Sequence, residues 1–182
     1  MKFRNLKIRK SHRKYFVYLL LLLVLLLIFS FFNKQVVSII FTIMLIVLGS
    51  MSSVFKRITG INLGIEFITF TTVLFFYSFG ITFGLMACAV MLLISTLSMG
   101  RISPENFTGY MMYCVIAIIS LFLDFGISAN GMILVLFMNL LGALILILLG
   151  LDIIKNSLYL IGNTIFNIIL FKYFSEIIFS IL

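Results

Sequence analysis

The chain is a succession of long apolar runs separated by charges, glycines or asparagines, and this pattern limits the fold more than any single motif. Each run has roughly 17 to 25 residues, the length that a helix needs to cross about 30 Å of hydrocarbon. In lipid the backbone must satisfy its own hydrogen bonds, so continuous apolar runs form helices. The chain is 64% hydrophobic and 10% charged, with a mean hydropathy of +1.33, which is more apolar surface than a soluble core of this length can bury. The sequence therefore predicts an all-α, polytopic membrane helix bundle.

Seven runs qualify as transmembrane helices, and a six-span alternative fuses the two runs on either side of Gly80. The third run is among the shortest and is the most polar, which predicts a tilted, half-inserted or broken helix. A basic tail, residues 1–14, precedes a single transmembrane domain, residues 15–182. The predicted spans are Tyr15–Phe32, Val36–Phe55, Asn62–Phe79, Ile81–Met99, Phe107–Leu123, Gly131–Leu149 and Ser157–Ile178.

The basic residues predict the orientation, because Lys and Arg close to a span resist export and stay in the cytoplasm. With seven spans and a cytoplasmic N-terminus, eleven of the thirteen basic residues lie on the cytoplasmic side, and only Lys34 and Lys172 lie outside. The cytoplasmic residues are Lys2, Arg4, Lys7, Arg9, Lys10, Arg13, Lys14, Lys56, Arg57, Arg101 and Lys155. We therefore expect a multi-pass protein of the cell membrane with its C-terminus outside.

The N-terminal block MKFRNLKIRKSHRK is short and basic, as nucleic-acid-binding arms are. Its position directly before an apolar run instead favours a role in setting orientation, in contact with anionic lipid head groups, at about 1 kcal/mol for each basic residue. The predicted partner is the lipid bilayer, and no nucleic-acid partner is expected.

Residues that carry catalytic chemistry are scarce. The one histidine, His12, lies in the basic tail, and no His or Cys pair has the spacing of metal ligands. Cys88 and Cys114 lie inside apolar runs, where a thiol behaves as a small apolar side chain. The sequence has no G-x-S-x-G motif and no phosphate-binding loop. It therefore predicts no enzyme activity, no metal and no cofactor.

A few polar residues lie in or beside the third and fourth spans, where each needs a partner or a water-filled cavity. Glu66 begins the third span, and Arg101 follows the fourth. An antiparallel pair of helices brings these two charges to the same, cytoplasmic face. Thr69 and Thr72 follow Glu66 at helical spacing and form one polar stripe.

Asparagines recur in the last two spans, with Asn139 in the sixth and Asn163 and Asn167 at i and i+4 in the seventh. An Asn amide in hydrocarbon usually bonds to another helix, at a gain of about 0.6 to 2 kcal/mol, so one interpretation is that these residues only join helices. The other hypothesis is a substrate-binding site, in which the asparagines share a cavity with Glu66, Thr69 and Arg101.

Gly80 and Gly84 form a small-xxx-small step at the start of the fourth span. Such steps let two helix backbones approach closely. The predicted role of both glycines is therefore helix packing.

A moderately polar span leads through FG-x-x-FG, here Phe79, Gly80, Phe83 and Gly84, into a helix rich in small residues. This pattern resembles the second and third helices of the substrate-binding S components of energy-coupling factor transporters, and MreD-type rod-shape proteins share it. The resemblance extends from Val36 to the end of the chain. It implies an apolar or amphipathic small molecule bound among the helices and a membrane transport subunit with ATPases as partner. The alternative, an MreD-like membrane scaffold, implies no ligand.

Overall fold

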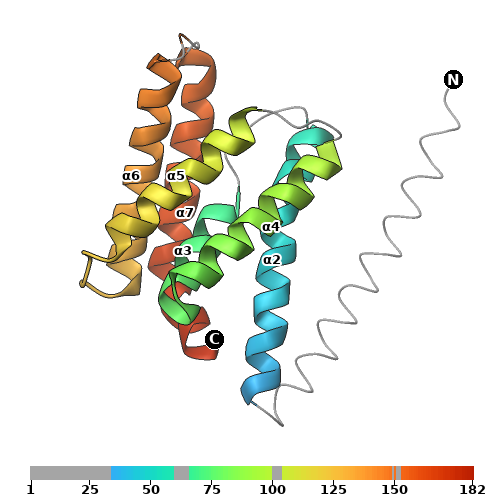
Figure 1. Ribbon diagram of the computed structural model, residues 1–182, viewed down its shortest axis with the longest axis vertical. Coiled ribbons are helices and arrows are strands. Elements are labelled where there is room, and N and C mark those ends of the chain that lie inside the picture. The colour runs from blue at the N-terminus through green and yellow to red at the C-terminus, as the bar shows by residue number, and fades with distance from the viewer. Residues whose placement is uncertain (1–33, 60–65, 100–103, 149, 151–152) are drawn as a thin grey trace, which may run out of the picture. The chain divides into compact units, whose positions relative to one another are not determined.

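The structure, a computed structural model, describes residues 34–59, 66–99, 104–148, 150 and 153–182. These residues are organised as helices and short connections, without strands, which confirms the all-α class for this part of the chain (Figure 1). The predicted first span, Tyr15–Phe32, and Arg101 lie outside the described residues. The helices are α2 (Lys34–Thr59), α3 (Ile68–Phe79), α4 (Ile81–Met99), α5 (Pro104–Ser120), α6 (Ile127–Leu148) and α7 (Ile153–Ile181).

Four of these helices are long and apolar enough to cross a membrane, and they are α2, α4, α6 and α7. Their apolar stretches are Lys34–Met51, Ile81–Ser98, Ile127–Ile145 and Ser157–Ile181. The apolar parts of α3 and α5 are shorter, at Ile68–Phe79 and Gly109–Ser120. Length and composition thus indicate a membrane-spanning protein, while the count of seven spans and the orientation stay predictions.

The helix bounds differ from the predicted spans mainly at the connections. α4 has the predicted bounds, whereas α5 begins three residues early at Pro104, since proline suits the first turn of a helix. α6 begins at Ile127, four residues before the start of the predicted span Gly131–Leu149. The positive φ of Gly126, 92°, marks the change of direction just before that helix.

The described residues divide between two compact units. One holds residues 34–42 with Ile181 and Leu182, and the other holds the described residues from Ile43 to Ser180. In the first unit the Ser38 hydroxyl donates to the carbonyl of Leu182 at 2.8 Å, and Thr42 donates to the carbonyl of Ser38. The second unit contains α3 to α6 and nearly all of α7.

In the second unit α3 is the innermost helix, with every residue from Ile68 to Phe76 buried. Its twelve residues span about 18 Å, less than the roughly 30 Å of a hydrocarbon core. Glu66 and Phe67, which precede α3, are not helical. The helix of the predicted third span thus starts at Ile68 and is too short to cross a bilayer alone.

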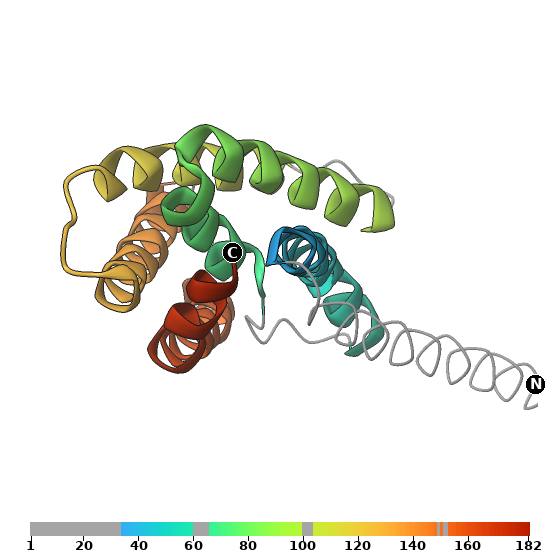
Figure 2. The same ribbon diagram turned by 90° about the horizontal axis from the view of Figure 1, so that it is seen from below.

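Aromatic side chains join α3 to α7, which run in the same direction. The ring centroids of Phe67 and Phe166 are 5.1 Å apart, and those of Phe70 and Phe171 are 4.9 Å apart. Figure 2 shows α3 between α7 on one side and α4 and α5 on the other. This position explains why α3 has no exposed face in its first nine residues, and why its threonines are buried with its apolar side chains.

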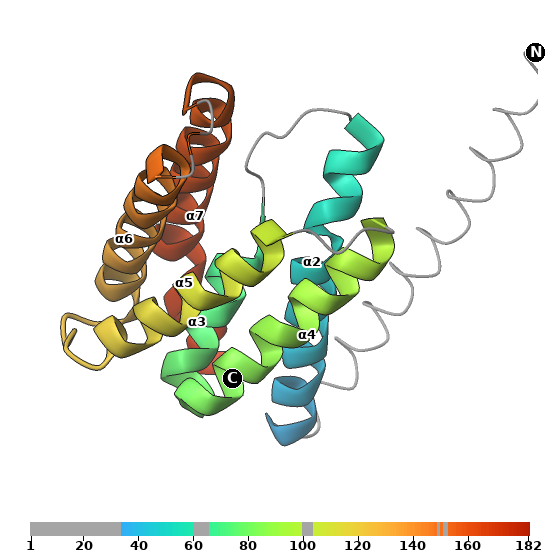
Figure 3. The same ribbon diagram turned by 45° about the horizontal axis from the view of Figure 1, so that its top comes forward.

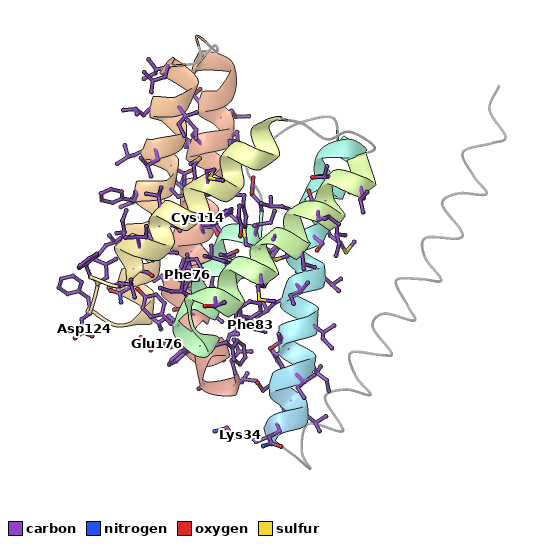
Figure 4. All side chains as sticks on the ribbon, viewed as in Figure 1. Lys34, Phe76, Phe83, Cys114, Asp124 and Glu176 are labelled. Atoms are coloured by element: carbon purple, nitrogen blue, oxygen red, sulfur yellow. The ribbon has the colours of Figure 1, made fainter. Side chains whose placement is uncertain are left out.

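The two glycines of the FG-x-x-FG pattern have different roles where α3 connects to α4. Gly80 has φ +90°, and a Cβ there would meet no atom within 4 Å, so it serves the turn between the helices. A Cβ on Gly84 would overlap the Phe76 ring. Close packing therefore occurs at Gly84, near the end of the bundle where Figure 4 labels Phe76 and Phe83.

α6 and α7 form an antiparallel pair, which Figure 3 shows side by side. Near one end a Cβ on Gly131 would overlap the Phe171 ring, and Ser128 donates to the carbonyl of Phe171 at 3.1 Å. Farther along, Gly142 faces Leu160. These contacts fix the position of α6 along the axis of α7.

Candidate functional site

Polar side chains of α6 and of the first half of α7, together with the residue two positions before α3, form one hydrogen-bonded network. Asn167 is the central residue of α7, and Asn139 lies near the centre of α6. We refer to the network as the polar cluster, and its members are Glu66, Asn139, Tyr159, Asn163 and Asn167.

Amide groups link α6 to α7 in this cluster. Asn163 Nδ2 donates to Asn139 Oδ1 at 3.4 Å, while Asn139 Nδ2 donates to the carbonyl of Val135 at 3.0 Å. Asn167 Nδ2 donates to the carbonyl of Asn163 at 3.0 Å and to Asn163 Oδ1. The three asparagines therefore form a chain of hydrogen bonds that crosses the α6–α7 contact.

Glu66 joins this chain through both its side chain and its backbone. The Tyr159 hydroxyl donates to Glu66 Oε1, and Asn167 Nδ2 donates to the backbone carbonyl of Glu66 at 3.4 Å. Glu66 and Tyr159 are partly exposed, whereas Asn163 and Asn167 are only 3% and 0% exposed. The carboxylate thus forms the more open end of the polar cluster, and the amides form its buried end.

Glu66 is predicted at the end of a span, near the membrane surface, but it lies farther along the axis of the bundle. Its carbonyl lies against Asn167, at the centre of α7, because α3 begins partway along the bundle rather than at its end. The start of α3 therefore brings a carboxylate to the same level as the asparagines. The sequence places Glu66 correctly at the head of the third helix, but the level of that helix is a property of the tertiary structure.

A further buried polar pair is formed by a residue of the first turn of α3 and a residue of α5. Thr69 Oγ1 and the Tyr113 hydroxyl of α5 are 2.9 Å apart, and either can donate. Both side chains are buried, and Tyr113 is within electrostatic range of Glu66 and Tyr159. Thr69 thus lies beside the polar cluster, and its hydroxyl is hydrogen-bonded to Tyr113 and not to a member of the cluster.

Among the described residues, two buried side-chain atoms lack a hydrogen-bond partner, and they are Asn167 Oδ1 and Thr72 Oγ1. An amide can be placed in two orientations, and its neighbours decide between them. Asn167 Nδ2 faces three oxygens, those of the Glu66 carbonyl, the Asn163 carbonyl and the Asn163 amide. Exchanging the two atoms would put an oxygen against three others, so the unpartnered atom is the amide oxygen.

The structure brings four of the candidate substrate-binding residues into the cluster, namely Glu66, Asn139, Asn163 and Asn167. It places Thr69 beside them, and Arg101 lies outside the described residues. The part of the chain that the structure describes holds no group of three or more His, Cys, Asp or Glu residues that could bind a metal.

Sequence reasoning missed Tyr159 and Tyr113. Tyr159 precedes Asn163 and Asn167 at the spacing i, i+4, i+8, so one polar face of α7 holds all three residues and was readable from the sequence. Tyr113 carries no comparable signal, because its partner Thr69 lies 44 residues away in sequence.

Comparisons of the chain with known protein families, with characterised proteins and with solved structures found no match.

Proposed function

We propose that this protein is a multi-pass protein of the cell membrane that binds a small amphipathic molecule among its helices, in the manner of a substrate-binding S component of an energy-coupling factor transporter. The observation that carries the proposal is the polar cluster. It gathers a carboxylate, three amides and a tyrosine from two long apolar helices and the start of a third. Polar groups among membrane-spanning helices are costly and typically mark functional sites.

The polar atoms of the cluster are not all hydrogen-bonded within the protein, which favours a ligand-binding role over a role only in joining helices. Residues that only join helices gain most when every buried polar atom is bonded. Here Asn167 Oδ1 is buried without a partner, while the Glu66 end of the same network is partly exposed. A small molecule that enters beside Glu66 would supply the missing hydrogen bond, and its apolar part would lie against the surrounding aliphatic and aromatic side chains.

Purification tests this function directly. We expect the full-length chain, extracted from its native membrane in mild detergent, to retain a small molecule that mass spectrometry identifies after denaturation. We also expect it to co-purify with a second membrane subunit and ATPases. Folded protein without a bound molecule and without an ATPase partner would exclude the S-component-like function.

The alternative is an MreD-like membrane scaffold without a ligand. It is favoured by the amides of Asn139 and Asn163, whose nitrogen atoms already donate within the protein. On this alternative the cluster only fixes α6 against α7. The same purification separates the two functions, because a scaffold retains other membrane or cell-shape proteins and no small molecule.

Replacing the Glu66 carboxylate by an amide tests whether Glu66 contributes to ligand binding. Glu66→Gln should lower the amount of retained molecule by about tenfold, the effect of losing one charge-assisted hydrogen bond. The matched control is Glu176→Gln, because Glu176 lies on the exposed surface of α7. Equal retention in the two variants would remove Glu66 from the site.

The proposed topology has its own test. Reporter fusions are expected to lie alternately outside and inside, beginning outside, when they follow Asn33, Arg57, Gly80, Arg101, Phe125 and Lys155. Any other order contradicts seven spans with a cytoplasmic N-terminus.

A further inference from the structure

Every donor atom of the polar cluster makes at least one hydrogen bond, and the one buried atom of the cluster without a partner is an acceptor. The Tyr159 hydroxyl donates to Glu66, and the amide nitrogens of Asn139, Asn163 and Asn167 each donate to an oxygen. The atom without a partner is Asn167 Oδ1, which has two lone pairs and no hydrogen. A ligand group that pairs with this oxygen must therefore donate a hydrogen bond.

The charge of the cluster selects among donating groups. Glu66 is the one acidic side chain of the cluster, and it precedes α3, whose N-terminal end favours negative charge. The Glu66 carboxylate therefore already occupies the N-terminal end of α3, where an anionic ligand would otherwise bind. A second anion would meet Glu66 and the amide oxygen of Asn167 at close range.

We infer that the polar end of the ligand is a protonated amine, which donates to Asn167 Oδ1 and is attracted by the Glu66 carboxylate. This inference rests on the proposed function and specifies its substrate class. An ammonium group supplies up to three hydrogens, and a charge-assisted hydrogen bond to a carboxylate is about twice as strong as a neutral one. The remainder of the molecule is apolar, as the helices around the cluster require.

Three probes that differ only in their head groups test the inference on the full-length protein in detergent. They are hexylammonium, hexanol and hexanoate, at equal concentration and ionic strength, and the readout is the midpoint of thermal unfolding followed by circular dichroism. At a concentration well above its dissociation constant, hexylammonium should raise the midpoint by about 3 °C. Hexanol should raise it less, and hexanoate should leave it unchanged.

Two variants of α7 separate binding at the cluster from partition of the probes into detergent. Asn167→Leu keeps the number and branching of the side-chain heavy atoms and removes the acceptor, so the shift with hexylammonium should disappear. Thr164→Val is the control, since Thr164 lies on the same helix and its hydroxyl bonds to the carbonyl of Leu160 outside the cluster. If Asn167→Leu does not fold, Glu66→Gln takes its place and should reduce the shift.

Several outcomes would overturn the inference. They are a hexanoate shift equal to or larger than that of hexylammonium, an undiminished shift in Asn167→Leu, and no shift with any probe. The inference and the proposed function can fail separately. A retained native molecule with a carboxylate and no amine would refute the amine while supporting the binding function. A hexylammonium shift in a protein that retains no molecule and no ATPase partner would support the amine site and count against the transport function.

Discussion

Two buried asparagines, Asn130 and Asn167, show how differently the same side chain is used at the α5–α6 connection and in the polar cluster. Asn130 Nδ2 donates to the carbonyl of Leu123 at 3.2 Å, and its Oδ1 accepts from the backbone N–H of Phe125 at 3.1 Å. In Asn167 the amide nitrogen donates to three oxygens, whereas the amide oxygen accepts from no donor. The two side chains are almost equally buried, at 2% and 0% exposure.

This difference separates a structural amide from a candidate binding amide. Asn130 satisfies both polar ends of its side chain within seven residues of chain, and so fixes a turn next to Asp124, which points away from the bundle in Figure 4. Asn167 completes only half of its hydrogen bonding with protein groups. Burial alone does not distinguish the two residues, whereas the inventory of donors and acceptors does.

The largest expected effect concerns packing beside the structural asparagine. Gly131→Leu should destabilise the protein by about 3 kcal/mol or more, because the new side chain would overlap the Phe171 ring. The measurement is thermal unfolding in detergent with a thiol-reactive dye, for which the buried Cys88 is a reporter. The control is Gly109→Leu, since a Cβ on Gly109 would meet no atom within 4 Å. Similar losses in both variants would mean that α6 and α7 are not held at the contact described.

A direct comparison of the two asparagines comes next. Asn130→Leu should cost about 2 kcal/mol, because a backbone N–H and a carbonyl lose their partners. Asn167→Leu should cost only about 1 kcal/mol, because the Asn163 carbonyl keeps its backbone donor within α7 and the substitution also removes a buried oxygen without a partner. The same unfolding assay checks the order. A larger loss for Asn167 than for Asn130 would indicate that Asn167 is the structural residue of the two.

A smaller effect is expected for the pair that flanks the cluster. Thr69→Val and Tyr113→Phe should each cost about 1 kcal/mol, and the double variant should cost less than their sum, because both remove the same buried hydrogen bond. A double-mutant cycle on unfolding free energies measures this coupling. Strict additivity would show that the two hydroxyls do not interact.

The smallest effect is predicted at the other unpartnered atom. Thr72→Val keeps the shape of the side chain and removes a buried hydroxyl without a partner, so stability should be unchanged or rise by a few tenths of a kcal/mol. Ligand retention should also be unchanged, in contrast to Asn167→Leu. A clear loss of stability would reveal a partner for Thr72.

Much of the fold follows from local pattern, and most of the candidate site does not. The apolar run Ile81–Met99 is a helix with the predicted bounds, because charge and glycine end it on both sides of a hydrophobic stretch. The four site residues that meet in the cluster were recognisable as polar groups among apolar ones. Which of them touch was not recognisable, since Glu66 and Asn167 are 101 residues apart in sequence.

The sequence by itself determined that this protein is helical and apolar enough for a membrane, and it determined which few polar residues lie within the apolar runs. The tertiary structure alone decided that α3 begins beside the centre of α7, that Tyr159 and Tyr113 join the predicted residues, and that Gly84 rather than Gly80 makes the close contact. The physical reason is that hydropathy is a local property of each run. Hydrogen-bond partners depend instead on the height and rotation of each helix relative to its neighbours, which large apolar and aromatic side chains fix by packing.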